Sequence, residues 1–104
     1  MLNSQWNEVN ERCGVILKDG TEVEAKNTHK FPHSNFTMDQ EFLDQLDLDN
    51  VACFWHTHPS NDLNLSVTDY DNFLKYPDHI HRIYSAFDYA DYYVRRGFIM
   101  RVEK

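Results

Sequence analysis

One run of residues dominates this sequence: Val51-Ala52-Cys53-Phe54-Trp55-His56-Thr57-His58. Apolar residues come first, which predicts a buried central strand over residues 51–58. Because residues i and i+2 of an extended chain point to the same side, His56 and His58 can direct their imidazole rings to one point. The run therefore predicts a pair of converging histidines at the end of a central strand.

A helix is predicted to follow this strand after a polar loop. It begins at Ser66, in the sequence Ser66-Val67-Thr68-Asp69, and extends to about Lys75. The Ser-x-x-Asp spacing fits a helix cap, and a helix start beside the strand end would bring the Asp69 carboxylate to the histidines. Two imidazole nitrogens and one carboxylate, with a fourth position left to water, are the ligand set of a catalytic zinc site.

Length and composition limit the class of protein. The 104 residues suffice for one compact domain, residues 1–104, and 41% hydrophobic residues suffice for a core. The net charge of −7 disfavours nonspecific nucleic-acid binding, which needs a basic face. No apolar run approaches the roughly 20 residues that cross a bilayer, and the N-terminus lacks the features of a signal peptide. Cys13 and Cys53 have no CxxC spacing, which suits two buried thiols in a reducing cytosol. We expect a soluble intracellular protein without a membrane or nucleic-acid partner.

The remaining segments predict a mixed sheet flanked by helices, an α+β fold. Strands are expected over residues 13–17, 21–27 and 79–87, the first two joined by an Asp19-Gly20 hairpin turn. Residues 89–102 are expected to form one more strand or a hairpin bent near Gly97. The helical segments are a weak amphipathic helix or helical turn over residues 4–12 and a clearer helix over residues 39–48, with Thr37 or Asp39 as its cap.

Other histidine patterns compete with the one at residues 56–58. His79-Ile80-His81 has the same spacing but no acidic residue placed to complete a site, so we interpret it as part of an ordinary strand. The metallo-β-lactamase pattern needs Asp-His where Ser60-Asn61 stand, and a histidine-triad hydrolase needs a third histidine at position 60. An amidohydrolase barrel needs roughly 200 residues or more.

The combined pattern resembles the JAMM motif of the JAB/MPN metallopeptidases. It consists of Glu11, then His56-Thr57-His58-Pro59, seven residues from Pro59 to Leu65, and Ser66-Val67-Thr68-Asp69. The segment Glu11-Arg12-Cys13-Gly14 looks like the Glu-x-x-Gly sequence that precedes the first strand of this family. The resemblance covers almost the whole chain and implies a cytidine-deaminase-like, three-layer arrangement.

The resemblance also implies a role for each motif residue. His56, His58 and Asp69 would hold Zn²⁺ with one water, Glu11 would act as general base and then acid, and Ser66 would support the oxyanion. The reaction would be hydrolysis of a peptide or isopeptide bond in a peptide or protein substrate. Glu11 can also be a solvated acid at the end of a helix, and Glu8, Glu22 and Glu24 are possible substitutes for it.

Within the family, the Cys13-Gly14 pair and the segment Asn35–Asp39 look most similar to prokaryotic and phage members, including phage tail assembly proteins. That similarity implies a location in the bacterial host cytoplasm or the virion tail, with other tail proteins as possible partners. Two alternatives stay open: a non-catalytic structural component of a phage tail or baseplate, and a processing peptidase for a small carrier protein with a Gly-Gly tail. The late aromatic residues (Tyr84, Phe87, Tyr89, Tyr92 and Tyr93) suit either an interface or core packing.

Overall fold

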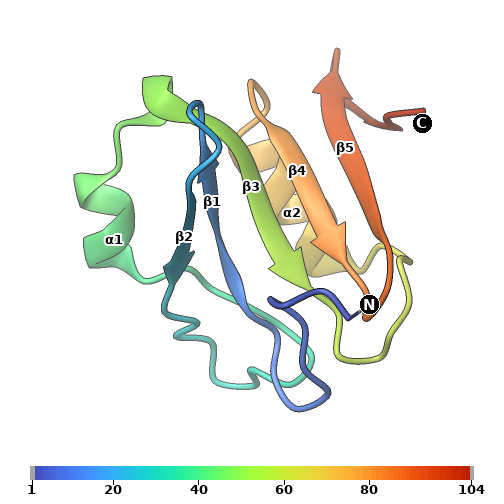
Figure 1. Ribbon diagram of the computed structural model, residues 1–104. Coiled ribbons are helices and arrows are strands. Elements are labelled where there is room, and N and C mark those ends of the chain that lie inside the picture. Colours follow the sequence, from blue (N-terminus) through green and yellow to red (C-terminus); the bar gives the residue numbers. More distant parts are fainter. Residues whose placement is uncertain (1, 104) are drawn as a thin grey trace.

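The computed structural model describes residues 2–103 and contains one mixed sheet with two short α-helices (Figure 1). In chain order the elements are β1 (Cys13–Leu17), β2 (Glu22–Ala25), α1 (Gln40–Gln45), the 3-10 turn η1 (Leu48–Asn50), β3 (Val51–Thr57), α2 (Val67–Lys75), β4 (Ile80–Tyr84), β5 (Tyr89–Arg95) and β6 (Phe98–Arg101). No helix among the described residues is long and apolar enough to cross a membrane.

The strand order is β2-β1-β3-β4-β5-β6, so the strand that carries His56 is central. It is antiparallel to β1 and parallel to β4, while the remaining neighbours are antiparallel. A parallel pair needs a crossover connection, and α2 provides it between β3 and β4. The start of α2 is therefore brought back to the carboxyl end of β3.

Both helices pack on the same face of this sheet. Val15, Phe54, His81 and Tyr92 are aligned by the strand registers, so their side chains lie on one face. Partly buried residues in and beside α1 (Phe42, Leu43 and Leu46) pack against the cluster that contains Val15 and Phe54. Phe73 of α2 packs against Ile83, Ala90 and Tyr92. The mixed sheet and its helices agree with the predicted α+β class, but the described residues form two layers, so the three-layer arrangement is not confirmed.

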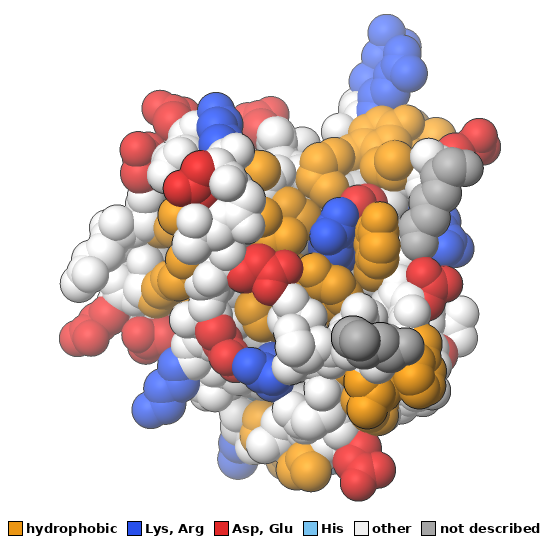
Figure 2. Space-filling model, viewed as in Figure 1, with side chains coloured by type: hydrophobic (Ala, Val, Ile, Leu, Met, Phe, Trp, Pro, Cys, Tyr) orange, Lys and Arg blue, Asp and Glu red, His pale blue; other side chains and the backbone are white. Residues whose placement is uncertain are grey.

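On the opposite face of the sheet, hydrophobic side chains lie among acidic and basic ones (Figure 2). Arg82 contacts Asp91 at 2.8 Å and lies over the Tyr89 ring at 4.1 Å from its centroid. The Tyr84 hydroxyl donates to Glu22 at 3.2 Å. Tyr92 instead stacks on Phe73 in the core, whereas Phe87 is exposed, so the late aromatic residues divide between packing and surface.

The segment over residues 4–12, predicted as a weak helix or a helical turn, forms no helix. This segment forms a turn and bends, because the Asn7 side chain accepts hydrogen bonds from the amides of Val9 and Asn10 at 2.9 Å. Such local bonds compete with helical ones. The Trp6 indole donates to the carbonyl of His58 at 2.8 Å, which fixes the segment beside the end of β3.

The other predicted elements are confirmed, some in shorter form. The segment over residues 89–102 is a hairpin, whose turn has positive φ at Arg96 (53°) and Gly97 (81°). A turn with two such residues matches the twist of antiparallel strands. Helix α1 has Asp39 at its N-cap position, but the Asp39 side chain makes no cap hydrogen bond. Both cysteines are buried free thiols, and burial raises the pKa of each to about 12.

Candidate metal centre

His56 and His58 converge as the sequence predicts. His56 is the second-to-last residue of β3, and His58 directly follows the strand. Their Nε2 atoms lie 3.2 Å apart, and both side chains are buried. Two nitrogens bound to one tetrahedral cation at about 2.0–2.1 Å would lie roughly 3.4 Å apart, so the spacing fits a shared metal ion.

Asp69 completes this group from the first turn of α2. Its Oδ1 lies 2.8 Å from Nε2 of His56, and its Oδ2 lies 3.2 Å from Nε2 of His58. The carboxylate is 1% exposed. Burial alone would raise the pKa of Asp69, but the hydrogen bonds from the two imidazoles outweigh burial and hold it well below the usual range. The carboxylate is therefore anionic, as a metal ligand must be.

The Ser66 cap places Asp69 in this position. The Ser66 hydroxyl accepts from the Asp69 amide at 3.1 Å, and the Ser66 amide donates to Oδ2 of Asp69 at 2.9 Å. This reciprocal pair is the capping box that the spacing predicts. The cap interpretation is confirmed, and it is compatible with the ligand interpretation of Ser66-x-x-Asp69, because the same carboxylate closes the helix start and faces both histidines.

The rings of both histidines are fixed by contacts behind the cluster. Nδ1 of His58 lies 3.1 Å from the Asp62 carbonyl, which fits an Nδ1–H donor, so a bound cation would take the place of the Nε2 proton that faces Asp69. The His56 ring stacks on Phe36, with centroids 4.4 Å apart. Burial lowers the pKa of His56, so this ring stays neutral. Burial also acts to lower the pKa of His58, but Asp69 outweighs it and raises the value.

Glu11 is a second carboxylate beside the histidine pair. It is 7% exposed, and one of its oxygens lies within 4.8 Å of ligand atoms of both His56 and His58. Glu11, His56 and His58 thus form a buried group that could hold a metal ion. Burial raises the pKa of Glu11 to about 7; the nearby His58 lowers it and Asp69 raises it. Glu11 lies outside any helix, two positions before the start of β1, and is buried, so it is not a solvated acid in a last helical turn.

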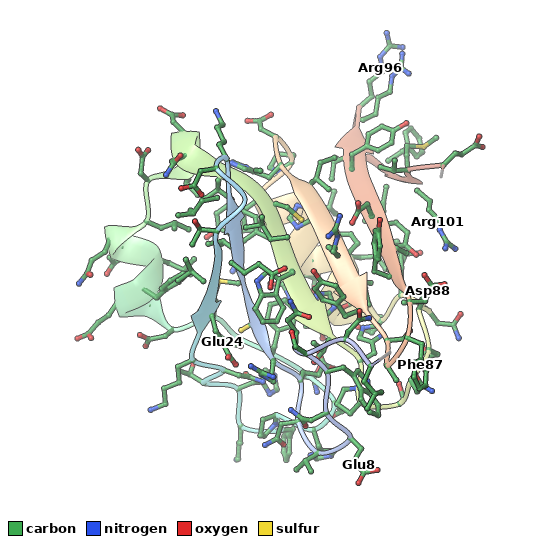
Figure 3. The ribbon with its side chains drawn as sticks, viewed as in Figure 1. Glu8, Glu24, Phe87, Asp88, Arg96 and Arg101 are labelled. Carbon is green, nitrogen blue, oxygen red and sulfur yellow. The ribbon has the colours of Figure 1, made fainter. Side chains whose placement is uncertain are left out.

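A polar cleft of about 310 Å³ leads to the cluster. Glu11, His58 and Ser66 all line it, together with His33, Ser34, Pro59, Ser60, Asp62, Asn64 and Leu65. The cleft therefore exposes one histidine, the second carboxylate and the cap hydroxyl to an incoming molecule. Glu24, one proposed substitute for Glu11, instead forms an ion pair with Arg12, and Glu22 accepts from Tyr84. Glu8 is exposed, and Figure 3 shows it at the tip of a loop, away from Glu24.

Asn27 is a residue of the site that the sequence did not indicate. Its Nδ2 donates to the carbonyls of Glu11 at 2.9 Å and Asn35 at 3.0 Å. Its Oδ1 accepts from the amides of His29 at 3.0 Å and Thr37 at 3.1 Å. One side chain thus joins the backbone of Glu11 to the loop that carries the cleft wall and Phe36. Nothing in the local sequence distinguishes Asn27 from an ordinary loop asparagine.

The second histidine pair does not form such a site. His81 is buried, and its Nε2 lies 2.8 Å from the Tyr76 carbonyl, while Nε2 of His79 lies 2.9 Å from the Leu48 carbonyl. The group of Glu11, His56 and His58, which could hold a metal ion, includes neither His79 nor His81. His81 lies in β4, as predicted for an ordinary strand, whereas His79 lies directly before that strand.

Comparisons with known proteins bear on the fold. No protein-family model matches the chain, and no curated protein matches it. A solved structure with a similar fold is the solution structure of protein DSY2949 from Desulfitobacterium hafniense, with a TM-score of 0.68 and 19% identity. The alignment covers 90% of this chain and 76% of that one. At this identity the likeness shows a shared α+β fold.

Proposed function

We propose that this chain is a zinc-dependent peptidase or isopeptidase of the JAMM type. The observation that carries the proposal is the convergence of His56, His58 and Asp69, with contacts of 2.8–3.2 Å, beside a buried Glu11. The arrangement joins residues from three separate parts of the chain. The unit β3–α2–β4 supports the finer assignment to a JAB/MPN-like, cytidine-deaminase-like fold, because its strand end and helix start carry the three proposed ligands.

His56, His58 and Asp69 would hold the cation, and Glu11 would move protons. A bound zinc ion would supply Lewis acidity, which polarises a carbonyl and acidifies water. Glu11 has a pKa of about 7, so its carboxylate can take a proton from water at neutral pH and return it to the leaving amine. Its place in the cleft wall puts it beside the space that a substrate would enter.

Ser66 is able to stabilise negative charge that develops on the substrate. Its oxygen accepts from the Asp69 amide, and this uses a lone pair but leaves the hydroxyl proton free. The same residue lines the cleft. We infer that this proton is donated to the oxyanion. In enzymes with such a site, removal of one donor lowers kcat by about 10²–10³-fold.

The cleft favours a peptide or protein over a nucleic acid. Apart from Pro59 and Leu65 its lining is polar or charged, and it includes the carboxylates of Glu11 and Asp62. These anionic groups would repel phosphates, whereas a peptide offers amides that can bond to them. The assignment to a phage tail, in the virion or the host cytoplasm, rests on sequence resemblance and belongs to the same proposal.

Metal analysis tests the proposed ligands. We expect about one zinc per chain in the purified protein, and loss of that zinc in His58→Ala. The matched control is His79→Ala, which removes an imidazole outside the cluster and should keep the zinc. Equal zinc in the wild type and in His58→Ala would contradict the proposed centre.

Glu11→Gln separates an enzyme from a structural metalloprotein that keeps the fold. The variant should bind zinc as the wild type does and lose hydrolysis of a peptide mixture, followed by mass spectrometry, by about 10²–10⁴-fold. Full activity in Glu11→Gln would remove it as the general base. A zinc-loaded wild type without hydrolysis of any peptide or candidate tail protein would favour the structural role.

A further inference from the structure

The hairpin of β5 and β6 forms a basic surface on an otherwise acidic protein. Residues 95–101, the basic hairpin, contain three arginines (Arg95, Arg96 and Arg101) and no acid, whereas the whole chain has a net charge of −7. Phe98 is 72% exposed and Met100 is 43% exposed between these arginines. Figure 3 shows Arg96 and Arg101 extending from this end of the sheet into solvent.

The three arginines have no acidic partner among residues 2–103. The described ion pairs involve Arg12 and Arg82 but none of Arg95, Arg96 and Arg101. In addition, β6 is the last strand of the sheet, so one of its edges is unpaired. Proteins usually protect such an edge from pairing with another chain, often with charged side chains. Charges would be enough for this protection, so it does not explain the exposed apolar side chains on β6. Phe98 and Met100 add the apolar contact area that a binding surface needs.

The opposite end of the sheet carries the complementary charge. Residues 39–49, the acidic segment, cover α1 and the start of η1 and contain five acids and no basic residue. These acids are Asp39, Glu41, Asp44, Asp47 and Asp49, and all but Asp39 are exposed. Leu48 is 40% exposed among them. In Figure 2 acidic side chains gather on the side where Figure 1 shows α1.

The two surfaces of one chain cannot neutralise each other. They lie at the β2 and β6 ends of the six-stranded sheet. Neighbouring strands are about 4.8 Å apart, so the two ends are separated by roughly 24 Å. Salt screens charges over about 10 Å at 0.1 M. A partner for the basic hairpin must therefore come from another molecule.

We propose that the basic hairpin of one copy binds the acidic segment of a second copy. Charge complementarity and an exposed apolar residue on each side support this occupant. A nucleic acid is disfavoured, because the remainder of the chain is acidic and would repel it. The contact joins two different surfaces, so a pair of copies still has one free hairpin and one free acidic segment. Such heterologous contacts build rings or open filaments rather than closed two-fold dimers.

Complementary variants test this geometry in sedimentation velocity. The hairpin variant is Arg95→Gln/Arg96→Gln/Arg101→Gln, and the acid variant is Glu41→Gln/Asp44→Asn/Asp49→Asn. At about 50 mM NaCl the wild type should form species larger than a dimer, and these should dissociate at about 500 mM. Each variant alone should be a monomer, because it lacks one of the two surfaces.

An equimolar mixture of the two variants is the decisive sample. The intact acidic segment of the hairpin variant can bind the intact hairpin of the acid variant, so the mixture should give a 1:1 dimer and nothing larger. The matched control, Lys18→Gln/Lys26→Gln/Lys75→Gln, changes the charge equally elsewhere and should assemble as the wild type does. A monomeric wild type at low salt, or a mixture that stays monomeric, overturns the proposal. Binding of a single-stranded oligonucleotide to the wild-type hairpin without self-association overturns it as well.

Discussion

Single buried side chains set how this protein responds to pH. His81 is 3% exposed and stacks on Phe73 with ring centroids 4.7 Å apart. Burial lowers the pKa of His81 to about 4 from its usual value of 6.5. An unfolded chain would bind a proton at this side chain near pH 6.5, while the folded chain binds it only near pH 4. Between these values the unfolded state holds more protons, so acidification favours unfolding.

We therefore expect His81 to make stability depend on pH between about 6.5 and 4. From pH 8 to pH 5 it should cost the wild type about 2 kcal/mol of unfolding free energy, since one pKa unit corresponds to about 1.4 kcal/mol. Over the same pH range the unfolding free energy of His81→Leu should fall by about 2 kcal/mol less than that of the wild type. Urea unfolding at both pH values measures the difference, with His79→Leu as the matched control. Parallel profiles for the wild type and His81→Leu would contradict this assignment.

At the scale of elements, strand β3 and helix α2 are local structures joined by one carboxylate. The capping box of α2 positions Asp69, which contacts both histidines at the end of β3. The loop over residues 28–37 is likewise joined to a distant part of the chain by one side chain, that of Asn27. The Asn27↔Met38 bridge closes its base, and the Asn27 side chain ties it to Glu11.

Removal of the cap hydroxyl should weaken both the helix and metal binding. Ser66→Ala loses the bond to the Asp69 amide, and we expect a loss of about 1 kcal/mol in stability. Because Asp69 is then less firmly oriented, zinc affinity should also fall, as measured by competition with a chromophoric chelator. Ser66→Thr keeps a cap hydroxyl and should retain both properties. An unchanged zinc affinity in Ser66→Ala would show that the cap does not position the carboxylate.

Loss of the Asn27 side chain should loosen the loop and Glu11 together. Asn27→Ala removes four hydrogen bonds at a partly exposed site, and we expect a loss of about 2 kcal/mol in stability. The amides of His29 and Thr37 should then exchange with solvent faster in hydrogen-exchange experiments, because both donate to Asn27. Asn10→Ala, at an exposed position of the same residue type, is the control. Unchanged exchange at His29 and Thr37 would mean that the loop is held by other contacts.

The elements that the sequence predicts correctly have signals within a few residues. An apolar run marks β3, Ser66-x-x-Asp69 marks the start of α2, and Gly97 marks the turn of the last hairpin. The failures depend on distant or competing contacts. The Asn7 side chain replaces the predicted helical bonds, and Asn27 gains its role from partners up to sixteen positions away. The common face of α1 and α2 likewise depends on strand order, which periodicity does not encode.

At the scale of the whole molecule, the proposed centre links three distant segments. A cation held by His56, His58 and Asp69 would connect the central strand to the crossover helix, with Glu11 adding the segment before β1. Ligands that bind the folded state alone stabilise it by about 2.7 kcal/mol at one hundred times their dissociation constant. Zinc removal should therefore affect global unfolding and not the site alone.

We expect chelation of zinc to lower the melting temperature by roughly 10–20 °C. This is the shift that a loss of about 2.7 kcal/mol in stability causes in a domain of about 100 residues. Differential scanning calorimetry with and without a chelator measures this change. His58→Ala should melt at the same temperature under both conditions. A chelator effect of equal size in His58→Ala would place the stabilising metal elsewhere.

The shared carboxylate of Asp69 has one more consequence. Because its oxygens already touch both imidazoles and the backbone at Ser66, an arriving ion would find its ligands already in place and would displace the proton that His58 donates to Asp69 instead of reorganising the chain. Loading would then acidify an unbuffered solution, and fraying of the first turn of α2 would open the route by which the ion escapes.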